Sequence, residues 1–304
     1  MIYSFLKEMK KNYIFYFMAL PGVIFLFLFS YVPLPGLVLA FKNYNFQDGI
    51  FGSPWAGLNN FAFFFGSDKA FAITFNTLYL NFLFIVFGLV FQIGSAILIN
   101  EVGNKHFKRT VQSIQFLPYF FSWVVVSGLI YSLFSSELGS VNRALEFLGM
   151  QPVSWYNDPA YWRPILVCTN LWKFTGYGAI IYLSTITGIS MEYYEAARMD
   201  GASKLQQIKY ITLPLLVPTA IILTLLSIGR IFYGDFGMMY SIVKDNGLLL
   251  KTTEVIDTYV YRSMRIIGDM SFASAVGLYQ SVAGFIIVYT TNWLSKKYQG
   301  TSLF

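Results

Sequence analysis

The sequence predicts an all-α, polytopic membrane protein. Of its 304 residues, 56% are hydrophobic and only 12% are charged, and the mean hydropathy is +0.56. Soluble domains carry about a quarter charged residues, so this composition excludes an ordinary soluble domain. The apolar residues also form long continuous runs, whereas the strands of an outer-membrane barrel would give short alternating segments. We therefore expect a single transmembrane domain of helices over residues 1–304.

Six stretches are long enough to cross a membrane. The hydrocarbon core is about 30 Å thick, so a spanning helix needs roughly 20 apolar residues. The fourth stretch, residues 162–188, meets this need although it contains Arg163 and Lys173. The first follows KEMKK but is too long for a signal peptide and has no small-residue cleavage site, which predicts an uncleaved span. The predicted spans are 13–40, 71–100, 111–135, 162–188, 213–233 and 271–294.

The distribution of positive charge predicts the orientation. If the amino terminus is cytoplasmic, the inner segments carry eleven Lys and Arg residues and the much longer outer loops carry eight. Because Lys and Arg near the ends of spans favour the cytoplasmic side, we expect both termini to be cytoplasmic. The inner cations are Lys7, Lys10, Lys11, Lys105, Lys108, Arg109, Arg198, Lys204, Lys209, Lys296 and Lys297. The outer cations are Lys42, Lys69, Arg143, Arg163, Lys244, Lys251, Arg262 and Arg265.

Residues that build metal or catalytic sites are scarce. The chain has one cysteine, Cys168, and one histidine, His106, which we interpret as a solvated loop residue next to Lys105. It contains no G-x-x-x-x-G-K-[ST] phosphate loop, no H-E-x-x-H and no G-x-S-x-G. We therefore predict no metal site, no nucleotide site and no catalytic residue in this chain.

A polar segment over residues 190–212 separates the fourth and fifth predicted spans, on the inner side. Ser190 is a good N-cap for a first short helix, and Gly201 provides a left-handed stop. Ser203 and Gln206 have the spacing of a capping box for a second helix. The segment is therefore predicted to form two short helices hinged at Gly201. The residues alone leave two interpretations open, because such helices could dock into a partner protein or rest on lipid head groups.

The same segment carries a family signature. It reads EAA, three residues, Gly, nine residues, then I-x-L-P, as Glu195-Ala196-Ala197, Gly201 and Ile211-Thr212-Leu213-Pro214. This resembles the cytoplasmic signature of permease subunits of binding-protein-dependent ABC importers. The stretches 171–189, 252–262, 275–281 and 300–304 are similar to carbohydrate-importer permeases of the LplB-like, MalF-type family, which serve oligosaccharides or polysaccharide fragments in Gram-positive bacteria.

The resemblance implies a fold and a mechanism. The fold would be the type I ABC importer transmembrane domain, and the segment 190–212 would contain the coupling helix that docks into a separate ATPase. Glu195, Ala196, Ala197 and Gly201 would be coupling residues, with Arg198 and Asp200 as flanking polar contacts.

The resemblance also implies partners. ATP and Mg would be bound by two copies of a cytoplasmic ATPase, and a second permease subunit would complete the pathway as a heterodimer. An extracellular solute-binding lipoprotein would deliver the oligosaccharide. The chain would lie in the cell membrane of a Gram-positive bacterium, in contact with lipid and with no nucleic acid partner.

Candidate substrate contacts are polar or aromatic residues within the spans. Charged groups inside a span are costly, so Lys173 could face a translocation cavity, although pairing with an acid or snorkelling would also account for it. Arg230 is expected to snorkel or to pair with Asp235. Aromatic rings can stack on sugars, but membrane packing and interfacial belts use them too. The candidate set is Trp172, Lys173, Tyr177, Tyr182, Tyr279 and Gln280. A loose tunnel, with the sugar bound mainly by the lipoprotein, is the alternative.

Two other classes of protein are alternatives to an ATP-driven importer. A secondary transporter or channel of six-helix type would couple through ionisable residues inside spans and often contains an inverted repeat. Lys173 alone supports this weakly, and no repeat is visible. A membrane-embedded enzyme would need a nucleophile and base or a cluster of metal ligands, which the sequence lacks.

Overall fold

The computed structural model describes residues 11–299. The predicted inner cations Lys7 and Lys10, and the stretch 300–304, lie outside these residues. Within them the chain is helical, with no β-strand beyond an isolated antiparallel bridge between Lys42 and Trp55. The expectation of an all-α protein is confirmed.

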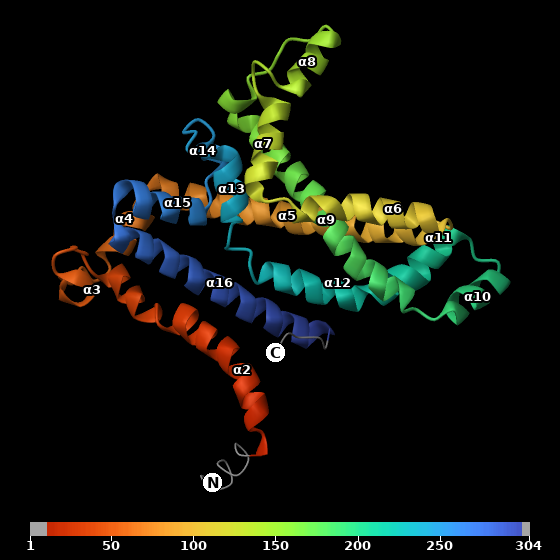
Figure 1. The fold of residues 1–304 in the computed structure, drawn as a ribbon, viewed down its shortest axis with the longest axis horizontal. Helices are drawn as coiled ribbons and strands as arrows, with labels where there is room; N and C mark the ends of the chain where they lie inside the picture. The colour runs from red at the N-terminus through yellow and green to blue at the C-terminus, as the bar shows by residue number, and fades with distance from the viewer. Residues whose placement is uncertain (1–10, 300–304) are drawn as a thin grey trace.

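The helices form an elongated bundle (Figure 1). Helices α5, α6 and α12 follow its long axis, α9 and α16 run obliquely beside them, and α7 and α8 stand across it. The helix bounds are α2 Tyr13–Leu26, α3 Gly49–Gly52, α4 Asn59–Phe65, α5 Asp68–Glu101, α6 Lys105–Phe116, α7 Trp123–Phe134, α8 Ser140–Phe147, α9 Trp162–Thr187, α10 Met191–Met199, α11 Lys204–Gln207, α12 Leu213–Ile228, α13 Phe236–Val243, α14 Leu250–Thr253, α15 Ile256–Arg262 and α16 Met270–Gln299.

The candidate membrane spans differ in detail from the prediction. In the described part of the chain, four helical segments are long and apolar enough to cross a membrane, and a bent pair could supply a fifth. The four are Tyr13–Phe41, Asp68–Glu101, Lys204–Ile228 and Met270–Lys297. The count of six therefore stays a prediction, because the fourth predicted span, now α9, is not among the apolar segments.

Helix α9 is less apolar than the four candidate spans, and other helices cover about half of it. Half of its 26 residues are buried, among them Thr169, Lys173 and Thr175. It packs along α5 and also contacts α6 and α12. A helix covered by other helices does not need an apolar surface on every side, so polar residues are tolerated where they find partners. This explains why α9 is long enough to span but less apolar than its neighbours.

The third predicted span, 111–135, is not a straight helix. Segments Lys105–Phe120 and Trp123–Phe134 meet at an angle of 102°. Pro118 lies in the 3₁₀ turn that ends the first segment, and Ser122 caps the second by accepting a hydrogen bond from the Val125 amide at 3.4 Å. A proline and a new N-cap are sequence features that end one helix and begin another.

The hydrophobic core has three parts, two of them along α5 and α9. One joins α5, α7, α9 and α13 around Leu80, Val126, Trp162 and Met238, all fully buried. Another joins α5, α9 and α12. The third joins α4, α5, α15 and α16. Helix α2 has no buried residue and diverges from the bundle (Figure 1).

Candidate functional site: a docking segment and a cavity

The segment with the EAA signature forms the far end of the bundle. Helices α10 and α11 lie beyond the carboxyl end of α5, opposite the end occupied by α3 and α4 (Figure 1). No residue of α10 is buried, and the Met199 side chain is 89% exposed. Every residue of α10 is therefore at least partly accessible to a partner.

The caps predicted for this segment are confirmed. The Ser190 hydroxyl accepts a hydrogen bond from the Glu192 amide at 3.3 Å, at the start of α10. At the start of α11, the Ser203 hydroxyl accepts from the Gln206 amide at 3.4 Å, and the Gln206 side chain accepts from the Ser203 amide at 2.7 Å. These bonds satisfy helix N-terminal amides that would otherwise have no partner within the helix.

Gly201 is the left-handed stop that was predicted. Its φ is +81°, a region that other residues rarely adopt. The Ala202 amide donates to the Ala197 carbonyl at 2.8 Å, and the Gly201 amide donates to the Arg198 carbonyl at 3.0 Å. This pair of bonds is the Schellman arrangement, which ends α10 and turns the chain into α11.

The polar side chains of the signature are available to a partner. Glu195, Arg198 and Asp200 are exposed, and within residues 11–299 none of them forms an ion pair. The segment is instead held from its other side, where the Tyr194 and Thr212 hydroxyls lie 2.9 Å apart and the Lys204 ammonium lies 2.9 Å from the Glu101 carboxylate. The structure therefore anchors α10 and α11 while leaving the motif residues free.

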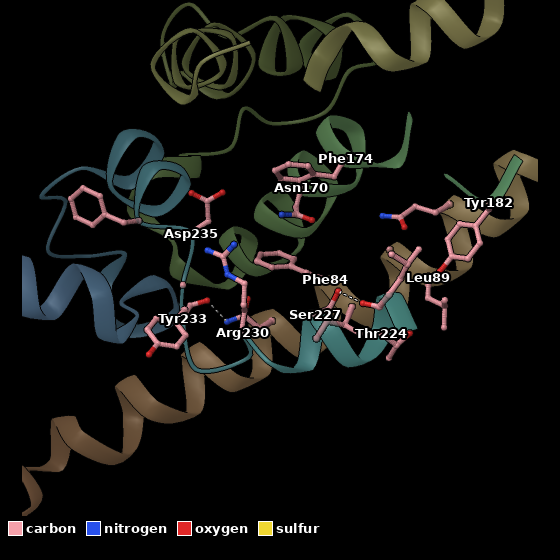
Figure 2. A pocket seen from close by; sticks show the side chains of 17 residues that line it. Phe84, Leu89, Asn170, Phe174, Tyr182, Thr224, Ser227, Arg230, Tyr233 and Asp235 are labelled. Atoms are coloured by element: carbon pink, nitrogen blue, oxygen red, sulfur yellow. Dashed lines mark hydrogen bonds between the residues drawn. The ribbon is translucent and has the colours of Figure 1, made fainter. Parts of the chain in front are cut away.

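A cavity of about 610 Å³ lies between α5, α9, α12 and the loop after α12 (Figure 2). Its aromatic walls are Phe84, Phe174, Tyr182 and Phe236. Its polar lining includes Asn81, Gln92, Asn170, Thr224, Ser227, Arg230 and Asp235. Aromatic faces combined with a few amides and charged groups form a site that can bind a polar ring-shaped ligand.

Of the six candidate substrate contacts, Tyr182 lines this cavity. Tyr279 is packed among aromatic rings and its hydroxyl lies 3.2 Å from that of Thr74. Tyr177 stacks on Tyr119 with ring centroids 4.5 Å apart, and Trp172 lines an apolar groove on another side of α9. Neither of these two borders the cavity.

Lys173 and Gln280 have structural partners instead. The Lys173 ammonium is buried against α7 and donates to the carbonyls of Pro118, Tyr119 and Phe121 at the break between α6 and α7. The Gln280 amide donates to the Phe232 carbonyl at 2.7 Å and to the Asp257 carboxylate at 3.0 Å. Neither side chain lines the cavity.

Arg230 does not form the expected pair with Asp235. The Asp235 carboxylate accepts from the Trp123 indole at 2.9 Å and from the Met238 amide at 3.0 Å. Within the described residues Arg230 forms no ion pair. In Figure 2 its guanidinium extends into the cavity, between Asp235 and Phe84.

Sequence reasoning missed most of the polar cavity lining. Asn81 and Gln92 lie eleven positions apart in the second predicted span, which is about three helical turns and places them on one face. Two amides on one face of an apolar span could have indicated a polar cavity beside that face. In the described part of the chain no group of three or more His, Cys, Asp or Glu side chains could hold a metal ion.

The fold and the exposed signature helix define an importer permease. The chain belongs to the family of binding-protein-dependent transport system inner membrane components, whose family model matches residues 84–300. It is a permease subunit, and its role is transport rather than catalysis by this chain. The secondary transporter and the membrane-embedded enzyme are thereby set aside.

Two relatives from Bacillus subtilis (strain 168) match almost the whole chain. Protein LplB is 33% identical over 301 residues, which cover 99% of this chain and 94% of the relative. The polygalacturonan/rhamnogalacturonan transport system permease protein YteP is 36% identical over 293 residues, covering 96% of this chain and 90% of the relative.

Solved structures match as well. A chain of a bacterial ABC transporter involved in the import of the acidic polysaccharide alginate superposes with a TM-score of 0.89 at 34% identity, covering 97% of this chain and 99% of that one. A bacterial alginate ABC transporter in complex with a periplasmic protein bound to an alginate pentasaccharide gives a TM-score of 0.88 at 34% identity, with 98% and 99% covered. The fold is the transmembrane domain of an ABC importer.

Proposed function

We propose that this chain is the permease through which an ATP-driven importer moves oligosaccharides delivered by an extracellular binding lipoprotein. The observation that carries the proposal is the accessible α10 with the turn after it, which together present Glu195, Ala196, Ala197 and Gly201 at one end of the bundle. The relative that belongs to a polygalacturonan/rhamnogalacturonan transport system and the matched alginate importer support a sugar as the cargo.

The α10 end is assigned to the cytoplasm. It contains the positively charged start of α6, where Lys105 and Arg109 are exposed and Lys108 is half-buried, and cations near span ends favour the cytoplasmic side. With this orientation both termini are cytoplasmic, and the chain is a multi-pass protein of a Gram-positive cell membrane. The Bacillus relatives support this location.

Coupling then proceeds through α10. Two copies of a separate ATPase would bind ATP and Mg, and each would hold a permease coupling helix in a surface cleft. Closure of the ATPases would move α10, together with α11 and the start of α12, as a lever. Such a lever works only if the two states make different contacts with the partner. A second permease, giving a heterodimer, would complete the pathway.

The cavity is the proposed passage for sugar in this subunit. The Gln92 amide and the Thr224 hydroxyl both line it and have no hydrogen-bond partner among the described residues, so they are free to bind sugar hydroxyls. Phe84 and Phe174 offer ring faces for stacking against sugar rings.

Substitution of Glu195 tests the coupling role. In the assembled importer, Glu195→Lys reverses an exposed charge at the proposed ATPase contact and should abolish ATP-driven oligosaccharide uptake or release the ATPase, while insertion into the membrane is unchanged. Glu137→Lys, which changes an exposed charge outside α10, is the matched control and should have no effect. Uptake and ATPase co-purification at the wild-type level in Glu195→Lys would refute the proposed coupling.

A further inference from the structure

We propose that Arg230 binds the carboxylate of an acidic oligosaccharide, so that the cavity selects sugars containing uronic acids. This inference rests on the proposed function and specifies the class of cargo. Arg230 follows α12 and lines the cavity beside Asp235. Its side chain extends into the open volume (Figure 2).

The guanidinium of Arg230 is not neutralised by a direct contact. The three ion pairs among the described residues use Lys204 and Arg262, not Arg230. The nearest acid in the lining, Asp235, is held by the Trp123 indole and the Met238 amide, with one donor on each oxygen. A guanidinium in a protein-lined cavity is a strong site for a carboxylate, because it offers two parallel N–H donors.

The charges around Asp235 reduce its ability to repel an anion. Lys173 lies close enough to Asp235 for a direct electrostatic attraction, and its ammonium has no carboxylate in contact. The Asp257 carboxylate contacts the loop after α12, where it accepts from the Gly234 amide at 2.6 Å, and it also accepts from the Gln280 amide. Burial raises the pKa of the Asp257 carboxyl group, because it disfavours the charged form.

The remaining lining suits a sugar that carries such a carboxylate. Gln92 and Thr224 lie along the cavity from Arg230, on α5 and α12, and can bind hydroxyls. Phe84 and Phe174 provide ring faces beside them. A cavity of about 610 Å³ has room for a few sugar units rather than a long polymer.

Transport by the complete importer, reconstituted with its binding protein, tests the inference. The probes are a galacturonic acid trisaccharide and its methyl ester, which share one scaffold and differ in charge. Arg230→Gln should lower uptake of the acid about tenfold or more, the size expected for a lost charge-assisted hydrogen bond, and should change uptake of the ester by less than about twofold. Because variants are compared on the same loaded binding protein, the selectivity of that protein cancels.

Two further variants make the result specific. Arg265→Gln removes an exposed cation that does not line the cavity and should affect neither probe. Arg230→Lys keeps the charge but loses the planar pair of donors, so it should show a smaller selective loss of the acid, and it serves as the test if Arg230→Gln does not assemble with the ATPase.

The outcomes separate the inference from the proposed function. Equal losses for acid and ester, or no loss for the acid, would overturn the role of Arg230. A wild-type importer that moves neutral oligosaccharides but no uronate would also overturn it, and would leave the proposed function intact. The absence of ATP-dependent uptake of any oligosaccharide would instead overturn the proposed function.

Discussion

Lys173, on α9, stabilises the break between α6 and α7. Its ammonium donates to the three carbonyls of Pro118, Tyr119 and Phe121, and it lies 5.0 Å from the ring of Trp123. Carbonyls at the end of a helix have no partner within it, and in a membrane water cannot replace that partner. A single charged residue thereby permits a sharp turn within an apolar region.

We predict that Lys173→Met destabilises the permease. The methionine fills much of the same space but leaves the Tyr119 and Phe121 carbonyls without a donor, whereas the Pro118 carbonyl still accepts from the Phe121 amide at 3.1 Å. Each buried polar group left unpaired costs about 1–3 kcal/mol. We expect a loss of about 2 kcal/mol or more, measured as a lower unfolding temperature of the purified complex. Lys69→Met, at an exposed position, is the control and should have little effect. A Lys173→Met protein as stable as the wild type would contradict this role.

Gly201 gives a second prediction at this scale. A Cβ atom there would meet no atom within 4 Å, so any cost of substitution comes from the φ of +81° alone. Gly201→Ala should destabilise the turn by about 1–2 kcal/mol, and Gly201→Asn by less, because Asn tolerates this conformation. Amide hydrogen exchange over residues 195–203 should be at least about fivefold faster in the alanine variant. Equal exchange rates in the Gly201→Ala and Gly201→Asn proteins would show that the turn does not depend on a residue that tolerates the left-handed conformation.

At the scale of elements, α9 organises the bundle through close contacts at two glycines. A Cβ atom at Gly176 would overlap the backbone of Gln115 on α6, and one at Gly178 would overlap the side chain of Gln92 on α5. Both glycines are buried. Helices can approach this closely in a membrane only where one of them carries a small residue.

The two glycines should respond differently to alanine. Backbone cannot move aside locally, so Gly176→Ala should separate α9 from α6 and destabilise the protein by about 1–3 kcal/mol. The Gln92 side chain can rotate, so Gly178→Ala should cost less stability but move a cavity-lining amide. The unfolding temperature should be lower for Gly176→Ala than for Gly178→Ala. Oligosaccharide uptake should fall in both variants. The reverse stability order would contradict the assigned packing.

The elements also show which features the sequence could predict. The caps of α10 and α11 depend on residues two or three positions apart, so Ser190, Ser203 and Gln206 could be assigned from local spacing. The break after α6 was missed although Pro118 and Ser122 mark it, because the apolar pattern continues on both sides.

Features that depend on how helices meet were beyond the sequence. Lys173 stands out as a charge in a span, but its partners lie more than 50 positions earlier, and only the packing of α9 against α6 and α7 brings them together. The cavity is likewise made where one face of α5 meets α12 and the loop after it. The sequence shows that Asn81 and Gln92 share a face, but not that this face borders a cavity.

At the scale of the whole molecule, the proposed mechanism places the ATPase at one end of the bundle. The α10 end presents exposed polar and apolar side chains of the coupling segment. The arm formed by α7 and α8 lies away from that end (Figure 1). On α8 the Phe147 side chain is 92% exposed, which makes it a suitable reference position outside the coupling segment.

Site-specific photo-cross-linking in intact cells tests the central claim most directly. A photoreactive amino acid is placed at Met199 on α10 or at Phe147 on α8, two positions of similar exposure, at 89% and 92%. If α10 is the coupling helix on the cytoplasmic side, the probe at position 199 forms an adduct with the ATPase subunit, whereas the probe at position 147 does not. An ATPase adduct from position 147, or none from position 199 in an importer that still takes up sugar, would contradict the account.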